Sequence, residues 1–187
     1  TVSAVNDAPV LATVSDVSFD EDGSGSTSLS GSDVDGDDLT YSITGGSDIT
    51  ASLSGSDVSF SAPANYNGSE EFTVSVTDGT ETDSQSITVT VNAVNDAPVA
   101  TAGLSGATDE DQSTVVTLSG SDVDGDNLTF SVGSALNGTL ELNGSLVTYT
   151  PDANYNGSDS FDFTVSDGSE SSTETVTLTV SAVNDAP

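Results

Sequence analysis

The sequence predicts an all-β protein built from two tandem β-sandwiches. Three observations predict this fold class: a set of motifs returns at one fixed spacing, apolar residues alternate with polar ones, and clusters of Gly, Asp, Asn and Ser interrupt the chain at short intervals. No apolar stripe with the helical period of about 3.6 residues occurs in the chain.

The fixed spacing defines the domains. "VNDAP" begins at Val5, Val94 and Val183, positions that lie 89 residues apart (94 − 5 and 183 − 94). "DVDGD", "ANYNGS" and a "DG" pair recur at the same spacing, with no insertion or deletion between the copies. A unit of this length is the size of one small sandwich. We therefore predict two domains, residues 1–96 and residues 97–187.

The alternation defines the strands. Phe72, Val74 and Val76 alternate with Thr and Ser, which is typical of a half-buried antiparallel strand. Counting such runs predicts seven short strands per copy, placed in the first copy near residues 10–14, 26–30, 39–43, 49–53, 58–61, 72–77 and 86–91. Seven strands in a unit of this size predict an immunoglobulin-like sandwich, with the acidic residues concentrated in its turns.

All charged side chains of the protein are acidic. The 187 residues include 31 Asp and Glu and no Lys, Arg or His, so the net charge is −31 and no salt bridge can form between side chains. Nucleic acid and anionic membranes are excluded as partners because both require basic side chains. No apolar run approaches the roughly 18 residues of a membrane span, so we expect no membrane insertion. We expect a monomer, and the start at Thr1 without a signal peptide indicates a piece of a longer chain.

The same composition restricts the chemistry. Without His, Lys, Arg or Cys the chain lacks the usual general bases, thiol nucleophiles and cationic anion stabilisers, and we predict that it is not an enzyme. A glycosidase that uses a pair of carboxylates is the remaining catalytic alternative. Disulfides and thiolate metal sites are excluded, and the ligands that remain are oxygens, which suit calcium or magnesium.

The "DVDGD" turn crowds carboxylates most closely. Asp33, Asp35 and Asp37 occupy alternate positions before a strand, and the second copy repeats the pattern. Like charges about 5 Å apart repel by roughly 3 kcal/mol per pair at an effective dielectric near 20, so the turn needs a cation or very strong hydration. An EF-hand is excluded because Asp38 stands where its Gly belongs and Thr44 replaces its last Glu. Ordinary Asp-Gly turn chemistry and solubility in saline media are the alternative explanations.

Topology predicts where the acidic motifs lie. In an antiparallel seven-stranded sandwich, the "DVDGD" and "DG" turns share the pole where the chain enters the domain. The "DED" turn after the first strand and "NYNGS" share the pole where it leaves, and "VNDAP" joins one domain to the next. We therefore expect the acidic motifs to converge on the domain junctions. "NYNG" has a second interpretation, a corner in which the Tyr66 or Tyr155 hydroxyl bonds a nearby backbone group.

Taken together, "VNDAP", "EDG", "DxDGDxLTY", "NYNG" and "VSDG" resemble the cadherin-like tandem repeats of very large bacterial surface adhesins of the RTX type. The resemblance covers the whole chain. It implies immunoglobulin/cadherin-like sandwiches with calcium bound between consecutive domains, and secretion through a type I system to the cell surface. Animal cadherin linkers carry a further acidic residue where this chain has Ala93, which leaves the number of ions per junction open.

The resemblance also implies the ligands. At the central junction they are Glu21, Asp22, Asn95, Asp96, Asp122, Asp124, Asp126 and Asp167, with the Ala97 carbonyl and Asn65 or Asn67 as additional candidates. At the two ends of the chain they are Asn6, Asp7, Asp33, Asp35, Asp37 and Asp78, and Glu110, Asp111, Asn184 and Asp185.

These expectations lead to one functional hypothesis and one alternative. The hypothesis is a calcium-rigidified extender repeat of a large extracellular adhesin, which holds an adhesive tip away from the cell and whose partners are calcium ions and the adjacent repeats. The alternative is that the domains themselves bind carbohydrate or a solid surface such as ice. Its support is a possible Thr ladder on strand exteriors, whereas most aromatic residues stand at inward strand positions.

Overall fold

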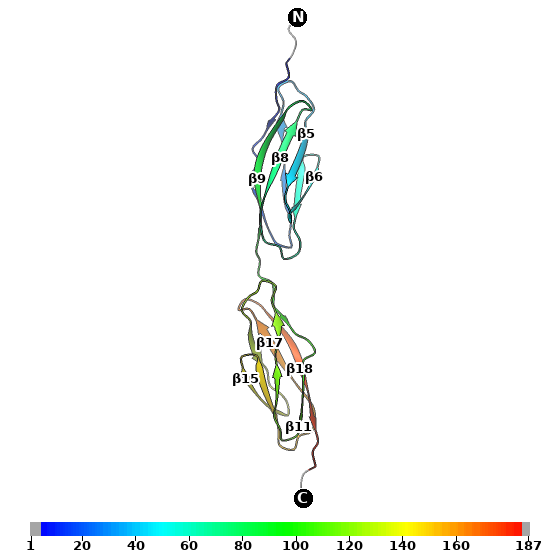
Figure 1. Ribbon diagram of the computed structural model, residues 1–187, viewed down its shortest axis with the longest axis vertical. Coiled ribbons are helices and arrows are strands. Elements are labelled where there is room, and N and C mark those ends of the chain that lie inside the picture. Colours follow the sequence, from blue (N-terminus) through cyan, green and yellow to red (C-terminus); the bar gives the residue numbers. More distant parts are fainter. Residues whose placement is uncertain (1–4, 185–187) are drawn as a thin grey trace. The chain divides into compact units, whose positions relative to one another are not determined.

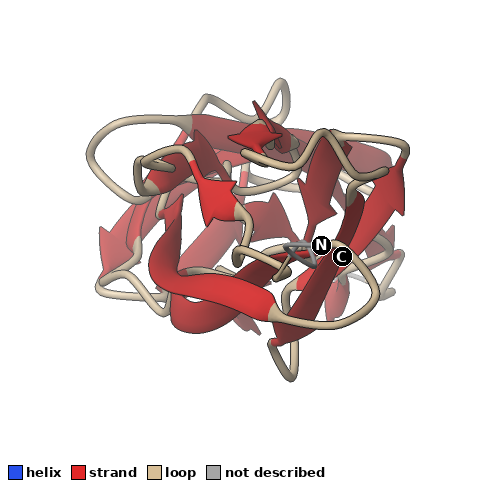
Figure 2. Ribbon diagram, turned by 90° about the horizontal axis from the view of Figure 1, so that it is seen from above, coloured by secondary structure: helices blue, strands red, loops and turns tan. Residues whose placement is uncertain are grey.

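A computed structural model describes residues 5–184, and it divides the chain into two compact units, Thr1–Val94 and Asn95–Pro187. The division falls between Val94 and Asn95, whereas the motif spacing placed it after residue 96. The described residues form strands, turns and loops only, as the colouring in Figure 2 shows. None of them belongs to a helix long and apolar enough to cross a membrane.

The first unit is a two-layer sandwich (Figure 1). One sheet has the order β2-β9-β8-β5, the other has the order β3-β7-β6, and β1 pairs with β4. Its strands are β1 (Val10–Leu11), β2 (Val17–Asp20), β3 (Gly25–Ser28), β4 (Gly31–Ser32), β5 (Thr40–Gly45), β6 (Thr50–Ser54), β7 (Asp57–Ser61), β8 (Gly68–Thr77) and β9 (Thr82–Asn92).

The second unit repeats this arrangement, with sheets β11-β18-β17-β14 and β12-β16-β15 and the pair β10-β13. Its strands are β10 (Val99–Ala100), β11 (Ser105–Asp109), β12 (Thr114–Thr117), β13 (Gly120–Ser121), β14 (Thr129–Val132), β15 (Gly138–Asn143), β16 (Leu146–Pro151), β17 (Gly157–Ser166) and β18 (Ser171–Ser181). If β1 and β2 are counted as two parts of one strand, and β3 and β4 likewise, the nine strands of the first unit reduce to seven, and the same holds in the second unit for β10 with β11 and β12 with β13. Both units therefore have the predicted seven-stranded immunoglobulin/cadherin-like layout, and the all-β prediction is confirmed.

The first strand differs from the prediction. Instead of one strand over residues 10–14, β1 pairs antiparallel with β4 and the chain then crosses to the other sheet, where β2 pairs parallel with β9. Side chains and backbone groups of β9 hold the segment that crosses between the sheets. The Gln85 amide accepts a hydrogen bond from Val14 N (3.2 Å) and donates to Ala12 O (3.0 Å). Asp16 Oδ1 accepts from Thr88 N at 2.8 Å. The two Gln85 contacts satisfy backbone groups of the segment that crosses between the sheets, and the Asp16 contact ties this segment to β9.

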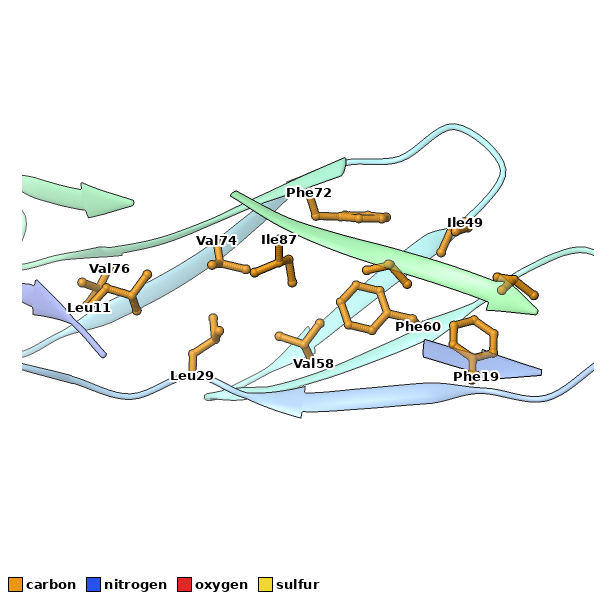
Figure 3. Close-up of a cluster of buried hydrophobic side chains, with 12 residues drawn as sticks. Leu11, Phe19, Leu29, Ile49, Val58, Phe60, Phe72, Val74, Val76 and Ile87 are labelled. Carbon is orange, nitrogen blue, oxygen red and sulfur yellow. The ribbon is translucent and has the colours of Figure 1, made fainter. Parts of the chain in front are cut away.

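The core of the first unit lies between its two sheets (Figure 3). Phe72, Val74 and Val76 point inward from β8, as their alternation predicted, and are fully buried. The ring of Phe72 meets that of Phe60 edge-on, with centroids 5.3 Å apart and planes at 71°, a favourable aromatic geometry. The second unit has Tyr149 at the position of Phe60, also fully buried.

Candidate functional site

Each unit has two poles, the N-terminal pole where its chain enters and the C-terminal pole where it leaves. At the N-terminal pole of the first unit, the loop between β4 and β5 winds around Asp33. Its Oδ1 accepts hydrogen bonds from the backbone N–H groups of Asp35 (2.8 Å), Gly36 (2.9 Å) and Asp37 (3.3 Å). Gly36 has φ +83°, a conformation that residues with a Cβ rarely adopt. The loop is therefore shaped by one carboxylate oxygen of its own first residue.

This winding gathers the Asp33 cluster, defined as Asp33, Asp35 and Asp37. One carboxylate oxygen from each lies within 4.8 Å of the others, and the same is true of the Asp122 cluster in the second unit, formed by Asp122, Asp124 and Asp126. There, Asp122 Oδ1 accepts from Asp124 N (2.9 Å) and Asp126 N (3.2 Å).

In each cluster, the second carboxylate oxygen of the first aspartate is unusual. Asp33 Oδ2 and Asp122 Oδ2 are buried, and within residues 5–184 neither has a hydrogen-bond partner. A buried anionic oxygen without a donor is costly, since buried polar atoms in folded proteins are nearly always paired. Because the chain has no cationic side chain, the partner that these oxygens lack must be a small cation or water.

The "ND" residues before each unit reach the same pole. Asn6 Nδ2 donates to Asp78 Oδ2 (2.9 Å), and Asp7 N donates to Asp35 Oδ2 (2.8 Å). The second unit has the same pair of contacts, from Asn95 Nδ2 to Asp167 Oδ2 (3.0 Å) and from Asp96 N to Asp124 Oδ2 (2.8 Å). The structure therefore joins the predicted linker ligands to the unit that follows them.

The turn after β8 orients the fourth acidic side chain of this pole. Asp78 Oδ1 accepts hydrogen bonds from Thr80 N (2.6 Å) and Glu81 N (2.7 Å). The Asn6 amide and then these backbone donors hold the pKa of Asp78 below its ordinary value. In the second unit, Glu170 N and then the Asn95 amide lower the pKa of Asp167 in the same way. Both carboxylates are thus stabilised in the charged form that binds a cation.

At the C-terminal pole a buried glutamate holds the departing strand. Glu21 is 7% exposed, its Oε1 accepts Val94 N at 2.6 Å, and its buried Oε2 has no partner in the described part of the chain. Glu110 is equally buried, and its Oε1 accepts Val183 N at 2.6 Å. Its Oε2 accepts from Asn156 Nδ2 at 3.4 Å, so the two copies differ at this atom.

The aspartates next to these glutamates act within their own units. Asp22 Oδ1 accepts Asn65 N (3.2 Å), and Asp111 Oδ1 accepts Asn154 N (3.0 Å), which ties the first acidic turn to the "NYNG" loop. Both aspartates have positive φ, 59° and 60°. At the corner that the sequence predicted, the Tyr155 hydroxyl donates to Ser158 O at 2.6 Å. The predicted ligand Asp185 lies outside the described residues.

The donor sets fit a hard cation. At each N-terminal pole the structure gathers carboxylates and an Asn side chain, at least one buried carboxylate oxygen lacks a donor, and nitrogen or sulfur ligands are absent from the composition. Calcium takes six to eight such oxygens in flexible geometry, whereas magnesium keeps several waters and demands a strict octahedron. The residues of both N-terminal poles, and Glu21 at a C-terminal pole, therefore suit calcium.

Because acidic residues were expected in turns, the structural roles of Glu70 and of its counterpart Asp159 were not predicted. Glu70 in β8 accepts hydrogen bonds from the backbone N–H groups of Ser47, Asp48 and Ile49, and Asp159 in β17 holds the same loop of the second unit. The signal was present: residue 70 has the same parity as the inward-facing Phe72 and Val74, so strict alternation turns its side chain inward.

Comparison with known proteins identifies the repeat. The sequence profile of one family, described as a bacterial Ig domain, matches residues 6–91 and 95–180. No curated protein is similar enough to the chain to count as a match.

Similar solved structures include two crystal forms of human protocadherin-24 EC1-2. They have TM-scores of 0.60 and 0.53 and are 18% and 17% identical to this chain, of which they cover 96% and 97%, and the alignments span the whole of those structures. At this identity the likeness shows the fold. An endo-fucoidan hydrolase of glycoside hydrolase family 107, MfFcnA4, is 23% identical over 94% of this chain with a TM-score of 0.40, and this chain spans only 29% of that enzyme's length.

Proposed function

Because the chain belongs to the bacterial Ig domain family, with one copy in each unit, we propose that it is a calcium-stiffened structural repeat of a bacterial surface adhesin. In this role it is an extracellular, non-enzymatic extender that holds an adhesive tip away from the cell. Its partners are calcium ions and the neighbouring repeats of its own chain.

One observation carries the calcium proposal: the buried oxygens Asp33 Oδ2, Asp122 Oδ2 and Glu21 Oε2 lack partners among residues 5–184 of a chain that has no cationic side chain. Calcium would satisfy these oxygens and cancel the repulsion within the two aspartate clusters. At a hundredfold excess over its Kd, each bound ion stabilises the folded state by about 2.7 kcal/mol.

The proposed stiffening rests on two consecutive residues that are hydrogen-bonded to different units. Val94 donates to Glu21 in the first unit, and the next residue, Asn95, donates to Asp167 in the second. Both acceptors belong to the proposed ligand set, so an ion that fixes Glu21 or Asp167 also restricts the backbone at this point of the chain. We expect calcium to reduce the freedom of the connection, as a rod of tandem domains requires.

The chemistry also suits an exported protein. Extracellular calcium modules bind at about 0.1–1 mM, far above cytosolic calcium, so the chain would stay loosely folded until export through a type I system and would then fold at the cell surface. The net charge of −31 opposes compaction until cations are bound.

The test is a calcium titration of the whole chain by calorimetry, combined with thermal melts. We compare wild type with the double variant Asp33→Asn/Asp122→Asn, and with Asp57→Asn/Asp162→Asn as a charge-matched control, since Asp57 in β7 and Asp162 in β17 are exposed and lie outside both clusters. Calcium should raise the Tm of wild type and of the control, and much less that of the cluster variant. An equal rise in all three, or no rise at all, would refute the calcium sites.

Stiffening is tested separately. Small-angle scattering of the wild-type chain should show a narrower distribution of maximum dimensions with calcium than with EDTA. If calcium binds but the distribution is unchanged, the sites stabilise single domains only, and the extender role loses its mechanical basis.

The alternative, a carbohydrate- or surface-binding module, has one observation in its favour. A shallow hollow on the outer face of the β3-β7-β6 sheet is lined by hydroxyl side chains and one carboxylate, from Ser26, Ser28, Ser52, Ser54, Asp57 and Ser59. The second unit has Val115 and Leu146 on the corresponding face, both exposed, where the first unit has Ser26 and Asp57, so this polar lining is not repeated there. Retention on a glycan array or on ice would support this alternative over the extender role.

A further inference from the structure

The chain contains four Asn-Gly pairs, beginning at Asn67, Asn137, Asn143 and Asn156. At such a pair the backbone nitrogen of the glycine can attack the Asn side-chain carbonyl carbon. A succinimide ring forms and ammonia leaves, and water then opens the ring to aspartate or isoaspartate. No enzyme, metal or oxidant is needed, and glycine favours the attack because it has no Cβ to hinder the approach.

We propose that Asn143–Gly144 in the second unit is a self-modification site that deamidates in the folded protein ahead of the other three pairs. Asn143 ends β15 and pairs with Leu146, so Gly144 and Ser145 form a two-residue hairpin turn, and Gly144 has φ +63°. In such a turn the flanking residues carry the backbone hydrogen bonds, which leaves the first turn N–H directed to solvent.

The surroundings of the turn leave room for the ring. Asn143 is exposed, and over residues 5–184 its amide has no hydrogen-bond partner. A methyl group built on Gly144 would meet no atom within 4 Å. The other side of the turn is anchored, because Ser145 O accepts Leu118 N at 2.7 Å, so the hairpin stays in place while the side chain is free to rotate.

At Asn137–Gly138, both backbone polar groups of the asparagine are hydrogen-bonded. Asn137 N donates to Asp159 Oδ2 at 2.9 Å, and its carbonyl accepts both the Tyr149 hydroxyl (3.2 Å) and Asp152 N (2.9 Å). Gly138 is packed so closely that an added Cβ would lie 2.5 Å from Thr150 O. This pair can react only when the loop opens.

The remaining two pairs begin long strands. Gly157 opens β17 opposite Val180, and the Asn156 amide is engaged with Glu110. Gly68 opens β8 opposite Val91 and lies against Tyr66, where a Cβ would be 2.9 Å from the hydroxyl. Reaction at a restrained site first requires local opening of the structure. Each increment of about 1.4 kcal/mol in the free energy of opening slows the reaction roughly tenfold.

The first unit supplies a natural comparison. It has the same turn at the equivalent position, with Ser54 paired to Asp57 and Gly55 at φ +65°, but serine cannot form a succinimide. The modification would therefore add one carboxylate, and for isoaspartate one backbone methylene, to the second unit alone. The turn lies at the N-terminal pole, which also carries the Asp122 cluster.

The experiment ages the whole chain in calcium buffer and follows each pair by peptide mass spectrometry, with isoaspartyl methyltransferase labelling as a second readout. Chymotrypsin is used because the chain has no Lys or Arg for trypsin to cleave. We expect the Asn143 peptide to convert roughly tenfold or more faster than the other three in the folded chain. In denaturant the four pairs should convert at similar rates.

Asn143→Ser, which copies the first unit, should abolish the fast conversion and leave the Tm unchanged. Conversion at Asn143 no faster than at Asn67, Asn137 or Asn156 in the folded chain would overturn the proposal. Equal selectivity in folded and denatured chains would also overturn it, because the preference would then come from local sequence and not from the turn. Neither outcome depends on whether calcium binds the clusters.

Discussion

Replacing Asp159 by Asn should destabilise the second unit more than any comparable change at an exposed carboxylate. Asp159 is 7% exposed and accepts four hydrogen bonds, from Leu136 N (3.2 Å), Asn137 N (2.9 Å), the Tyr149 hydroxyl (3.0 Å) and Ser160 N (2.8 Å). Asn keeps one accepting oxygen but places an NH₂ group where Oδ2 receives two of these donors.

The magnitude follows from those two bonds. Hydrogen bonds to a charged group contribute about 1.5–3 kcal/mol each, and the Asn137 N–H would be left facing another donor. The Tyr149 hydroxyl is within 3.2 Å of Asn137 O and keeps that partner, which offsets part of the loss. We therefore expect a loss of about 3 kcal/mol, which for a domain of this size lowers the Tm by roughly 10 °C or more.

The assay is differential scanning calorimetry at saturating calcium, with amide hydrogen exchange to assign the affected unit. Exchange at Leu136 and Asn137 should accelerate, while the first unit should be unchanged. Asp162→Asn is the matched control, because Asp162 is an exposed residue of the same strand and its side chain accepts a hydrogen bond from the Thr175 hydroxyl at 2.7 Å. If both variants lower the Tm equally, net charge and not the hydrogen-bonded network accounts for the effect, and the reasoning fails.

Three further predictions concern the same scaffold. Burial raises the pKa of Asp159, but its four donors outweigh burial and hold the pKa below the ordinary value, and Asp48 N and Ser47 N lower that of Glu70. Because these folded-state pKa values are depressed, the stability they contribute is complete above the unfolded carboxyl pKa of about 4 and is lost as pH falls through the folded values. The Tm gap between wild type and Asp159→Asn, measured from neutral pH downward, should shrink in this acidic range, and a gap independent of pH would contradict the assignment. Gly46→Ala should cost about 2 kcal/mol or more in chemical denaturation, since Gly46 has φ +76° and its added Cβ would strike the Phe72 ring, whereas Gly55→Ala, in open space, should cost about 1 kcal/mol. Gln85→Ala should cost about 1–2 kcal/mol and speed proteolysis near Ala12, and unchanged cleavage there would mean that the crossing does not depend on Gln85.

The sequence alone was sufficient for the fold because both of its signals can be read directly from the order of the residues. The alternation around Phe72 fixes which strand face is buried, and the fixed repeat spacing fixes the domain count. The split of the first strand was not predictable in this way. It depends on Gln85, which is more than seventy residues away along the chain and whose role no local pattern reveals.

The aspartate clusters were predictable from spacing, since alternate residues of a tight turn necessarily come close together. The local role of Asp22, which holds the backbone of Asn65, was not, because it depends on how two turns meet at one pole. Glu70 and Asp159 are intermediate cases. The alternation of their strands predicts that both side chains face the interior, but the expectation that acidic residues lie in turns led us to overlook this.

The parallel pairing of β2 with β9, and of β11 with β18, determines how each unit bears tension. β2 runs alongside β9 over four residue pairs and β11 alongside β18 over five, and in each unit the chain enters at one pole and leaves at the other. A pull on the two ends drives these parallel neighbours in opposite directions along their length, so the load falls on the whole ladder in shear and its hydrogen bonds must fail together. The longer ladder of the second unit should rupture at the higher force. The first unit would therefore unfold first when the chain is pulled.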